Sequence, residues 1–241
     1  MSETKRYKNP PLIQVASSIW WHVEESRNFE KSKFISGILY PKLKEHYEEF
    51  EVLAGSNNPF TSLILLNKDK QYVLEIAPNE LKLSSVDENY CWNEFFAHVH
   101  FMNSLVVENL VNLLELDHVH ARLEYVDFFK YNYSAADNNL SSYLSANLNV
   151  NINSNILNNP SSISLSLKQK ISDEITSSID LKIGKSDSEE GIIVHLKNDS
   201  NKMDVHIETL DNWFNKSHDL SKQQFEGIIK GPLKKSLEYV K

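Results

Sequence analysis

The sequence contains little cysteine, little glycine and no long apolar run, and each shortage excludes a class of protein. Cys91 is the single cysteine, so an intramolecular disulfide cannot form, and a reducing compartment fits. The 6 glycines form no phosphate-cradling cluster, and the nucleophile-elbow, P-loop and dinucleotide-binding motifs are absent. No stretch of about 18 apolar residues occurs, and the N-terminal segment is too polar for a signal peptide. The sequence therefore predicts a cytoplasmic protein without a membrane span or a bound cofactor.

The 241 residues carry a formal net charge of −8, and 41% of them are hydrophobic. This hydrophobic content is ordinary for a globular protein, and the length fits one large domain or two small ones. The negative net charge argues against a broad electrostatic hold on a nucleic acid backbone. Basic tracts occur at Lys5–Lys8 and Lys230–Lys241, where we expect them to be solvated.

Two segments alternate between apolar and polar residues as strands do. The central one, residues 117–129, carries Val119, Ala121, Leu123 and Tyr125 on its apolar face. Its polar face carries His118, His120, Arg122 and Glu124. The other segment, residues 12–25, follows the prolines at 10 and 11. Its more polar face carries Gln14, Ser18, Trp20, His22 and Glu24.

The first half also predicts two helical regions and three short strands. Helical spacing over residues 34–50 is interrupted by Pro41, which either opens a second helix or kinks one. Alternation and turn residues predict strands over 60–66, 71–76 and 80–86. The clearest helix is expected over 91–114, where apolar residues recur every three or four positions.

The second half repeats this order of elements. Asp137 is expected to cap a short helix, and an asparagine-rich segment, residues 147–159, predicts an irregular connection. Four strands follow, over residues 162–170, 175–183, 191–198 and 203–210, with a hairpin loop at 199–202. Leu220-Ser221 and Gln224 resemble a capping box that opens a final helix, and Gly231-Pro232 should kink or break it.

Both halves therefore consist of a strand, a helix, three or four strands and a long helix. We divide the chain into 1–115 and 116–241 as two similar α+β halves of one continuous module. Side by side, the halves would form a curved antiparallel sheet with helices on one face, the layout of the TATA-binding protein. This analogy concerns the fold and implies no function.

Short segments of the chain resemble the TIGR04255 family, a sporadically distributed group of uncharacterised bacterial and archaeal proteins. The resemblance extends over nearly the full length, at Tyr7–Leu12, Tyr40-Pro41, Tyr90–Phe95, Arg122–Tyr125, Leu210, His218, Phe225 and Ile228–Ile229. It implies a full-length single module and brings no known catalytic residue. The family's scattered distribution implies mobile genes, and so a partner in a defence or toxin–antitoxin type of system.

The 9 histidines raise the question of a metal site. His118 and His120 share a strand face, and in a hairpin of residues 191–210 His195 and His206 would lie opposite each other, near Asp204 and Glu208. The spacing matches no metalloprotease or zinc-finger pattern, so we predict solvated strand histidines and no metal. Cys91, between Tyr90 and Trp92 at a helix start, is interpreted as a packing residue instead of a nucleophile.

The two polar strand faces are the best candidates for a binding site. If the halves lie side by side, these faces join into one surface with an aromatic ring, an arginine and several titratable groups. The candidate residues are Trp20, His22, Glu24, His118, His120, Arg122 and Glu124. Arg122 would anchor an anionic group or a partner's peptide. The alternative is an ordinary solvated sheet face, with Trp20 covered by helices or loops.

These observations favour a non-enzymatic interaction module that binds another protein, such as the product of a neighbouring gene. A nucleic-acid-binding saddle is the second hypothesis, against which the net charge counts. An enzyme or small-ligand site on the polar sheet face is the third. An exposed Trp20 or an edge strand of the sheet would also serve a homodimer.

Overall fold

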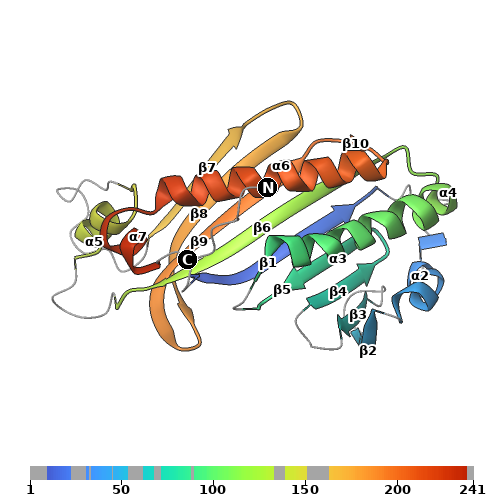
Figure 1. The fold of residues 1–241 in the computed structure, drawn as a ribbon, viewed down its shortest axis with the longest axis horizontal. Helices are drawn as coiled ribbons and strands as arrows, with labels where there is room; N and C mark the ends of the chain where they lie inside the picture. The colour runs from blue at the N-terminus through green and yellow to red at the C-terminus, as the bar shows by residue number, and fades with distance from the viewer. Residues whose placement is uncertain are drawn as a thin grey trace.

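The computed structural model describes residues 10–22, 31–32, 34–44, 46–53, 62–67, 72–87, 90–132, 139–150 and 163–237. Within them the chain forms an antiparallel sheet with long helices across one face (Figure 1). The strands are β1 (Leu12–Trp20), β2 (Tyr47–Leu53), β3 (Ser62–Asn67), β4 (Tyr72–Ala77), β5 (Glu80–Ser85), β6 (His118–Lys130), β7 (Ser164–Lys170), β8 (Ile175–Ser186), β9 (Glu189–Ser200) and β10 (Met203–Asp204). The helices are α2 (Ile35–Leu43), α3 (Trp92–Leu105), the π-helical turn η1 (Val106–Leu110), α4 (Val111–Leu114), α5 (Leu140–Asn147), α6 (Ile207–Ile228) and α7 (Gly231–Leu237).

The sheet is curved and does not close into a barrel. Its strand order among the described residues is β2-β3-β4-β5-β1-β6-β9-β8-β7, and β10 pairs with β6 outside this path. The two predicted polar strands, β1 and β6, are neighbours at the centre of the sheet. Their antiparallel register places Trp20 opposite His120 and Ser18 opposite Arg122. The α+β class and the curved antiparallel sheet with helices on one face are therefore confirmed.

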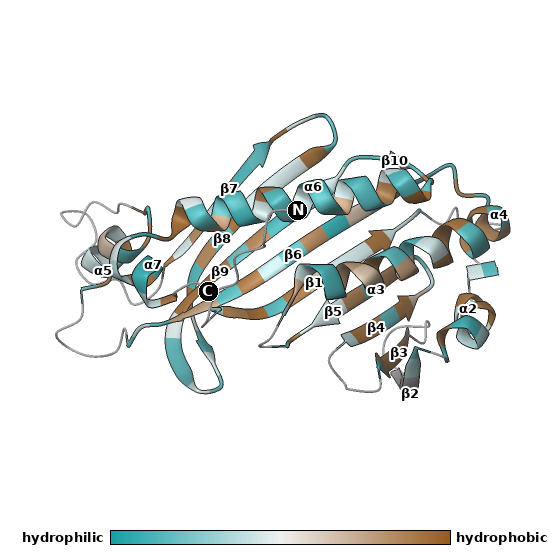
Figure 2. Cartoon of the chain, viewed as in Figure 1, coloured by the Kyte–Doolittle hydropathy of each residue, from teal (hydrophilic) through white to brown (hydrophobic). Residues whose placement is uncertain are grey.

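The core lies between the sheet and the helices on one of its faces. Side chains of β6 alternate between buried and half-buried from His118 to Phe129, as expected for a strand with one covered face. The continuous helical segment from α3 through α4 covers the first half of this face, and α6 packs over β6 and β9. Figure 2 shows α6 largely hydrophilic on the side that faces the viewer, while Leu210, Trp213 and Phe214 are buried against the sheet. We call the opposite side of the sheet the open face.

The final helix differs from the prediction. The expected strand over 203–210 ends at Asp204, and α6 begins at Ile207. Ser221, predicted to lie at the helix start, is buried inside α6, where its hydroxyl accepts a hydrogen bond from Asn198 Nδ2 (2.9 Å). A polar residue that resembled a helix cap instead satisfies a buried amide on β9. The predicted break at Gly231-Pro232 is confirmed, because α6 ends at Ile228 and α7 starts at Gly231.

The helical region around Pro41 is shorter than predicted. Helix α2 contains Pro41 in its last turn and ends at Leu43, and Tyr47 already begins β2. In the second half, Asn139 caps α5 by accepting a hydrogen bond from the Ser142 backbone N–H (3.0 Å). The expected cap, Asp137, lies outside the described residues. No helix in the part of the chain that the structure describes is both long and apolar enough to cross a membrane.

Gly191 provides a stability prediction, because β6 approaches β9 closely where Gly191 pairs with Lys130. A Cβ atom at Gly191 would lie 2.5 Å from the backbone oxygen of Phe129 and 2.5 Å from ring atoms of Phe128. Gly191→Ala should therefore lower the free energy of unfolding by about 1–3 kcal/mol. Gly37→Ala is the matched control, because nothing lies within 4 Å of its added Cβ. Because Gly37 lies within helix α2, Gly37→Ala should raise the free energy of unfolding by about 0.5–1 kcal/mol. Equal effects in urea denaturation would contradict the prediction.

Candidate functional site

Three side chains stack on the open face where β1 and β6 meet. The rings of Trp20 and His120 lie 5.3 Å apart, measured between centroids, and are inclined by only 13°. The guanidinium carbon of Arg122 lies 5.1 Å from the centroid of the Trp20 ring. A cation at this distance is attracted to the electron-rich face of indole. The stack follows from the register, since Trp20 pairs with His120 and Arg122 is two residues further along β6.

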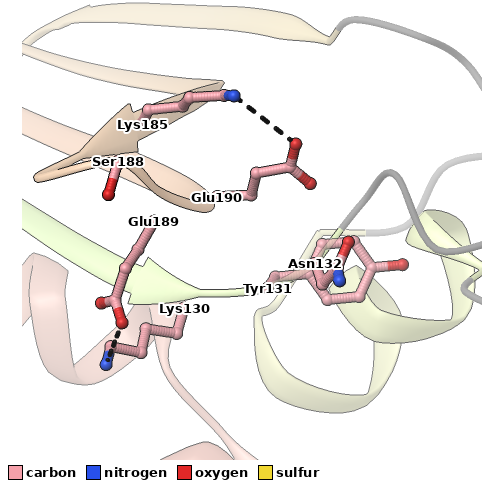
Figure 3. A pocket seen from close by; sticks show the side chains of 7 residues that line it. All are labelled: Lys130, Tyr131, Asn132, Lys185, Ser188, Glu189 and Glu190. Carbon is pink, nitrogen blue, oxygen red and sulfur yellow. Dashed lines mark ion pairs between the residues drawn. The ribbon is translucent and has the colours of Figure 1, made fainter.

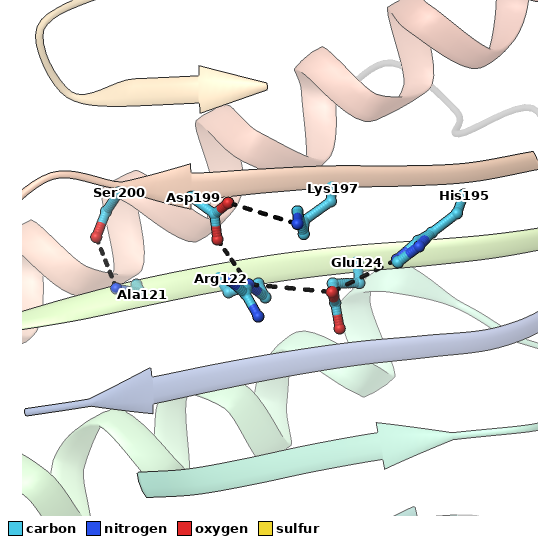
Figure 4. Close-up of polar contacts among 7 residues, drawn as sticks. All are labelled: Ala121, Arg122, Glu124, His195, Lys197, Asp199 and Ser200. Carbon is cyan, nitrogen blue, oxygen red and sulfur yellow. Dashed lines mark hydrogen bonds and ion pairs between the residues drawn. The ribbon is translucent and has the colours of Figure 1, made fainter. Parts of the chain in front are cut away.

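Arg122 is also held by two carboxylates, one on its own strand and one on the neighbouring β9 (Figure 4). Its Nε lies 2.6 Å from Asp199 Oδ1 on β9 and 3.9 Å from Glu124 Oε1 on β6. The chain of polar contacts continues from Asp199 to Lys197 (3.9 Å) and from Glu124 to the His195 ring (3.4 Å). Arg122 therefore belongs to a ladder of alternating charges that crosses two strands and fixes its orientation above Trp20.

The charges of this ladder lower the pKa of the Glu124 carboxyl. Burial alone raises the pKa of the Glu124 carboxyl, but the contacts with His195, Arg122 and Lys82 outweigh it and hold the pKa below its usual value. Lys82 belongs to β5, on the far side of β1. The ladder thus extends across four strands, from β5 through β1 and β6 to β9. Glu124 is ionised at neutral pH and keeps the surface electrostatically mixed.

Two further histidines surround His120 at the edge of the stack. The rings of His22 and His118 lie 5.6 Å and 6.1 Å from that of His120, both nearly perpendicular to it. Burial lowers the pKa of His120 and outweighs a hydrogen bond with the Ser200 backbone that raises it, and repulsion by His22, His118 and Lys202 lowers it further. His120 is therefore neutral at pH 7 and contributes an aromatic surface. The described residues contain no group of three or more His, Cys, Asp or Glu side chains placed to hold a metal ion.

The structure brings six of the seven predicted site residues onto one face. Trp20, His120, Arg122 and Glu124 are in the stack or the ladder, and His22 and His118 lie beside it. Glu24 lies outside the described residues. The prediction missed Asp199, because it placed residues 199–202 in a loop, whereas β9 continues to Ser200. The continuing alternation from His195 through Lys197 to Asp199 was the signal that could have identified it.

The predicted hairpin of residues 191–210 is wrong. Met203 and Asp204 pair with Val119 and His118 of β6, not with β9. His206 precedes the first turn of α6 and does not face His195 across a hairpin. The arrangement that would have placed His195, His206, Asp204 and Glu208 together therefore does not form.

A second polar cluster lies on the helix-covered face and joins three elements. The Tyr125 hydroxyl on β6 lies 3.0 Å from the Tyr90 hydroxyl and 2.7 Å from Nδ1 of His218 on α6. The His218 ring stacks on Trp92 of α3, with centroids 4.2 Å apart and planes 2° from parallel. Burial lowers the pKa of His218 to about 4, so the ring is neutral at pH 7. This cluster fastens α3 and α6 to the central strand.

A hollow of about 540 Å³ lies beside the β8–β9 turn (Figure 3). Residues of three segments line it, namely Lys130, Tyr131, Asn132, Lys185, Ser188, Glu189 and Glu190. Lys130 pairs with Glu189 (2.7 Å) and Lys185 with Glu190 (3.8 Å). Because these charges neutralise each other, the hollow presents no arrangement selective for a charged ligand.

Comparisons with protein-family models, with curated proteins and with solved structures found no match to this chain. The geometry of the open face and the charges on it are therefore the basis for assigning a function.

Proposed function

We propose that this chain is a non-enzymatic interaction module that binds another protein through the open face of its sheet. The observation that carries the proposal is the stack of Trp20, His120 and Arg122 at the centre of that face. Tryptophan and arginine are the residue types that most often dominate the energy of a protein interface. Here both are oriented in advance, so binding costs little side-chain entropy.

The mixed charge of the open face favours a protein over a nucleic acid. Lys82, Arg122 and Lys197 alternate there with carboxylates such as Glu124 and Asp199. A phosphate backbone would meet these carboxylates as well as the cations, and the formal net charge of the chain is −8. A protein partner can match both signs of charge. A nucleic-acid saddle stays the second candidate, suggested by the curved open sheet, and a gel shift at low salt tests it.

We also propose that residues 1–115 and 116–241 are two structurally related halves in the layout of the TATA-binding protein. The strand order supports this, because β1 and β6 are adjacent and each half extends outward from its own central strand. In each half a helix follows the central strand, α2 or α5, and a long helical segment follows the remaining strands. The resemblance to the TIGR04255 family fits a module of this kind acting beside a defence or toxin–antitoxin system.

The experiment is a binding measurement with the products of the genes that neighbour its own, each co-expressed and titrated against the purified protein. For a product that binds, Trp20→Ala and Arg122→Ala should each raise the Kd at least about tenfold, as expected for interface anchors. Phe34→Ala and Lys216→Ala are the matched controls, because Phe34 is exposed beside α2 and Lys216 is exposed on α6. The controls should leave the Kd unchanged.

Two results would count against the proposal. One is that no neighbouring gene product binds the protein. The other is that a product binds, but the open-face variants and the controls bind it equally well. Near-UV circular dichroism of each variant separates a binding defect from a folding defect.

A further inference from the structure

We infer that the edge strand β7 accepts an added β-strand from a partner protein, supplied by an extended segment in which apolar and acidic residues alternate. This surface lies at the end of the sheet, away from the Trp20 stack. The inference is independent of the open-face proposal and stands even if the open-face variants bind normally.

Strand β7 presents an edge with which no other described strand pairs. In the described chain it pairs with β8 alone, and all seven of its residues are exposed. The Ile183 N–H donates to the Ile163 carbonyl, and the Ile171 N–H donates to the Ile175 carbonyl. In an antiparallel pair of strands, every second residue hydrogen-bonds to the partner strand. The odd-numbered residues of β7 therefore direct their backbone groups to β8. The backbone groups of Ser164, Ser166, Lys168 and Lys170 therefore point away from the sheet, where a further strand would pair.

Elsewhere in the sheet the helices cover one face. At the β7 edge, that same face is apolar and exposed. Leu165 and Leu167 pair with Leu181 and Ile179 of β8, so their side chains lie on the same side as the core. Helix α6 packs over β6 and β9, and the β7 side of the hairpin extends past it (Figure 1). Leu167 is consequently 67% exposed and Leu165 37% exposed. Apolar residues of an added strand would cover both leucines.

The other side of the edge carries positive charge. Lys168 lies opposite Ser178, and Lys182 lies opposite Ser164. Neither lysine forms an ion pair with another described residue, whereas Lys170 pairs with Asp173 (2.6 Å). One carboxylate, Asp180, faces Ser166 on this side. Acidic residues on an added strand would lie next to Lys168 and Lys182, which favours an acidic partner segment.

A second copy of the chain fits this edge less well. Pairing of β7 with β7 of another copy around a two-fold axis would place Lys168 and Lys170 of both copies on the same side of the joined sheet. Like charges gathered on adjacent strands repel each other. The charge pattern therefore selects an acidic segment of a different protein.

The test uses the full chain labelled with ¹⁵N and a capped seven-residue peptide that alternates Ile and Glu. A peptide that alternates Ile and Lys serves as the charge-reversed probe. We expect amide shift changes centred on residues 164–170 and tighter binding of the Glu peptide than of the Lys peptide. The Lys168 N–H points away from β8, so Lys168→Pro removes this N–H without removing a hydrogen bond to β8. Proline is tolerated at such edge positions. Lys168→Ala removes the charge and keeps the N–H.

Lys168→Pro should weaken binding of the Glu peptide about tenfold, since it removes one hydrogen bond and one cation. Lys168→Ala should weaken it about threefold, the size expected for an exposed ion pair. Three results would overturn the inference. These are unchanged affinity in Lys168→Pro, shift changes confined to the Trp20 stack, and a wild-type dimer in sedimentation that Lys168→Pro converts to a monomer. The last result would assign the edge to self-association.

Discussion

Replacing Asp127 with asparagine is expected to raise the free energy of unfolding by about 4 kcal/mol at pH 8 and to leave it nearly unchanged at pH 4. Asp127 points into the helix-covered face of β6, and its register partners are Leu12 and Val194. Its side chain is buried, and burial raises the pKa of its carboxyl from 3.8 to about 7. Asparagine keeps the shape of the side chain and cannot ionise, so it removes the cost of a buried charge.

The sign follows from proton binding. The folded-state pKa of Asp127 is higher than that of the unfolded chain, so between pH 4 and pH 7 the folded protein holds the extra proton. Stability therefore falls in the wild-type protein as pH rises through this window, and the Asp127 contribution is fully lost above about pH 7. Urea denaturation of both proteins between pH 4 and pH 8 measures the difference. Asp219→Asn, at an exposed position of α6, is the control. A constant difference between wild type and Asp127→Asn across this range would contradict the prediction.

Replacing His218 with phenylalanine is expected to have the opposite pH dependence. Burial lowers the pKa of His218 from 6.5 to about 4, so between these values the unfolded chain binds the extra proton. The wild-type protein therefore loses about 3 kcal/mol of stability from this group as pH falls from about 6.5 to about 4. His218→Phe removes that loss and preserves a ring against Trp92, although the hydrogen bond to Tyr125 is lost.

The lost hydrogen bond should make His218→Phe less stable than the wild type at pH 7, by about 1–3 kcal/mol. This deficit should shrink or reverse at pH 4.5. Because the contributions of Asp127 and His218 oppose each other, the wild-type protein should show only a weak pH dependence between pH 4 and pH 6.5. The two variants should show clear slopes of opposite sign. Parallel slopes in the two variants would show that one of the assignments is wrong.

Alternation was enough to predict the central strands and which of their polar side chains share a face. On β1 and β6 every second side chain faces the core, so the polar sets around Trp20 and Arg122 followed directly from the sequence. Their adjacency followed from the repeated order of elements. The partner of Arg122 did not follow, because Asp199 lies near the strand end and its residue type is typical of a turn. Only the pairing of β9 with β6 places it 2.6 Å from Arg122.

The start of α6 could not be predicted from local signals. Residues Met203–Leu210 alternate in hydropathy well enough for a strand, and Leu220-Ser221 with Gln224 resembles a capping box. In the structure Trp213 and Phe214 need the helical period to reach the core, and Ser221 accepts a hydrogen bond from Asn198. Tertiary packing decided the helix boundary. The burial of Asp127 was likewise not predictable from the sequence, because it depends on the pairing of Asp127 with Leu12 of β1 and Val194 of β9.

The most direct test of the proposed interaction surface is photo-crosslinking from defined positions. A photoreactive residue at Lys82 lies on the open face, and one at Asn212 lies on the exposed side of α6. With a neighbouring gene product that binds, the open-face position should form the crosslink, and Trp20→Ala should abolish it. A crosslink from Asn212 with none from Lys82 would contradict the proposal and place the partner on the helices.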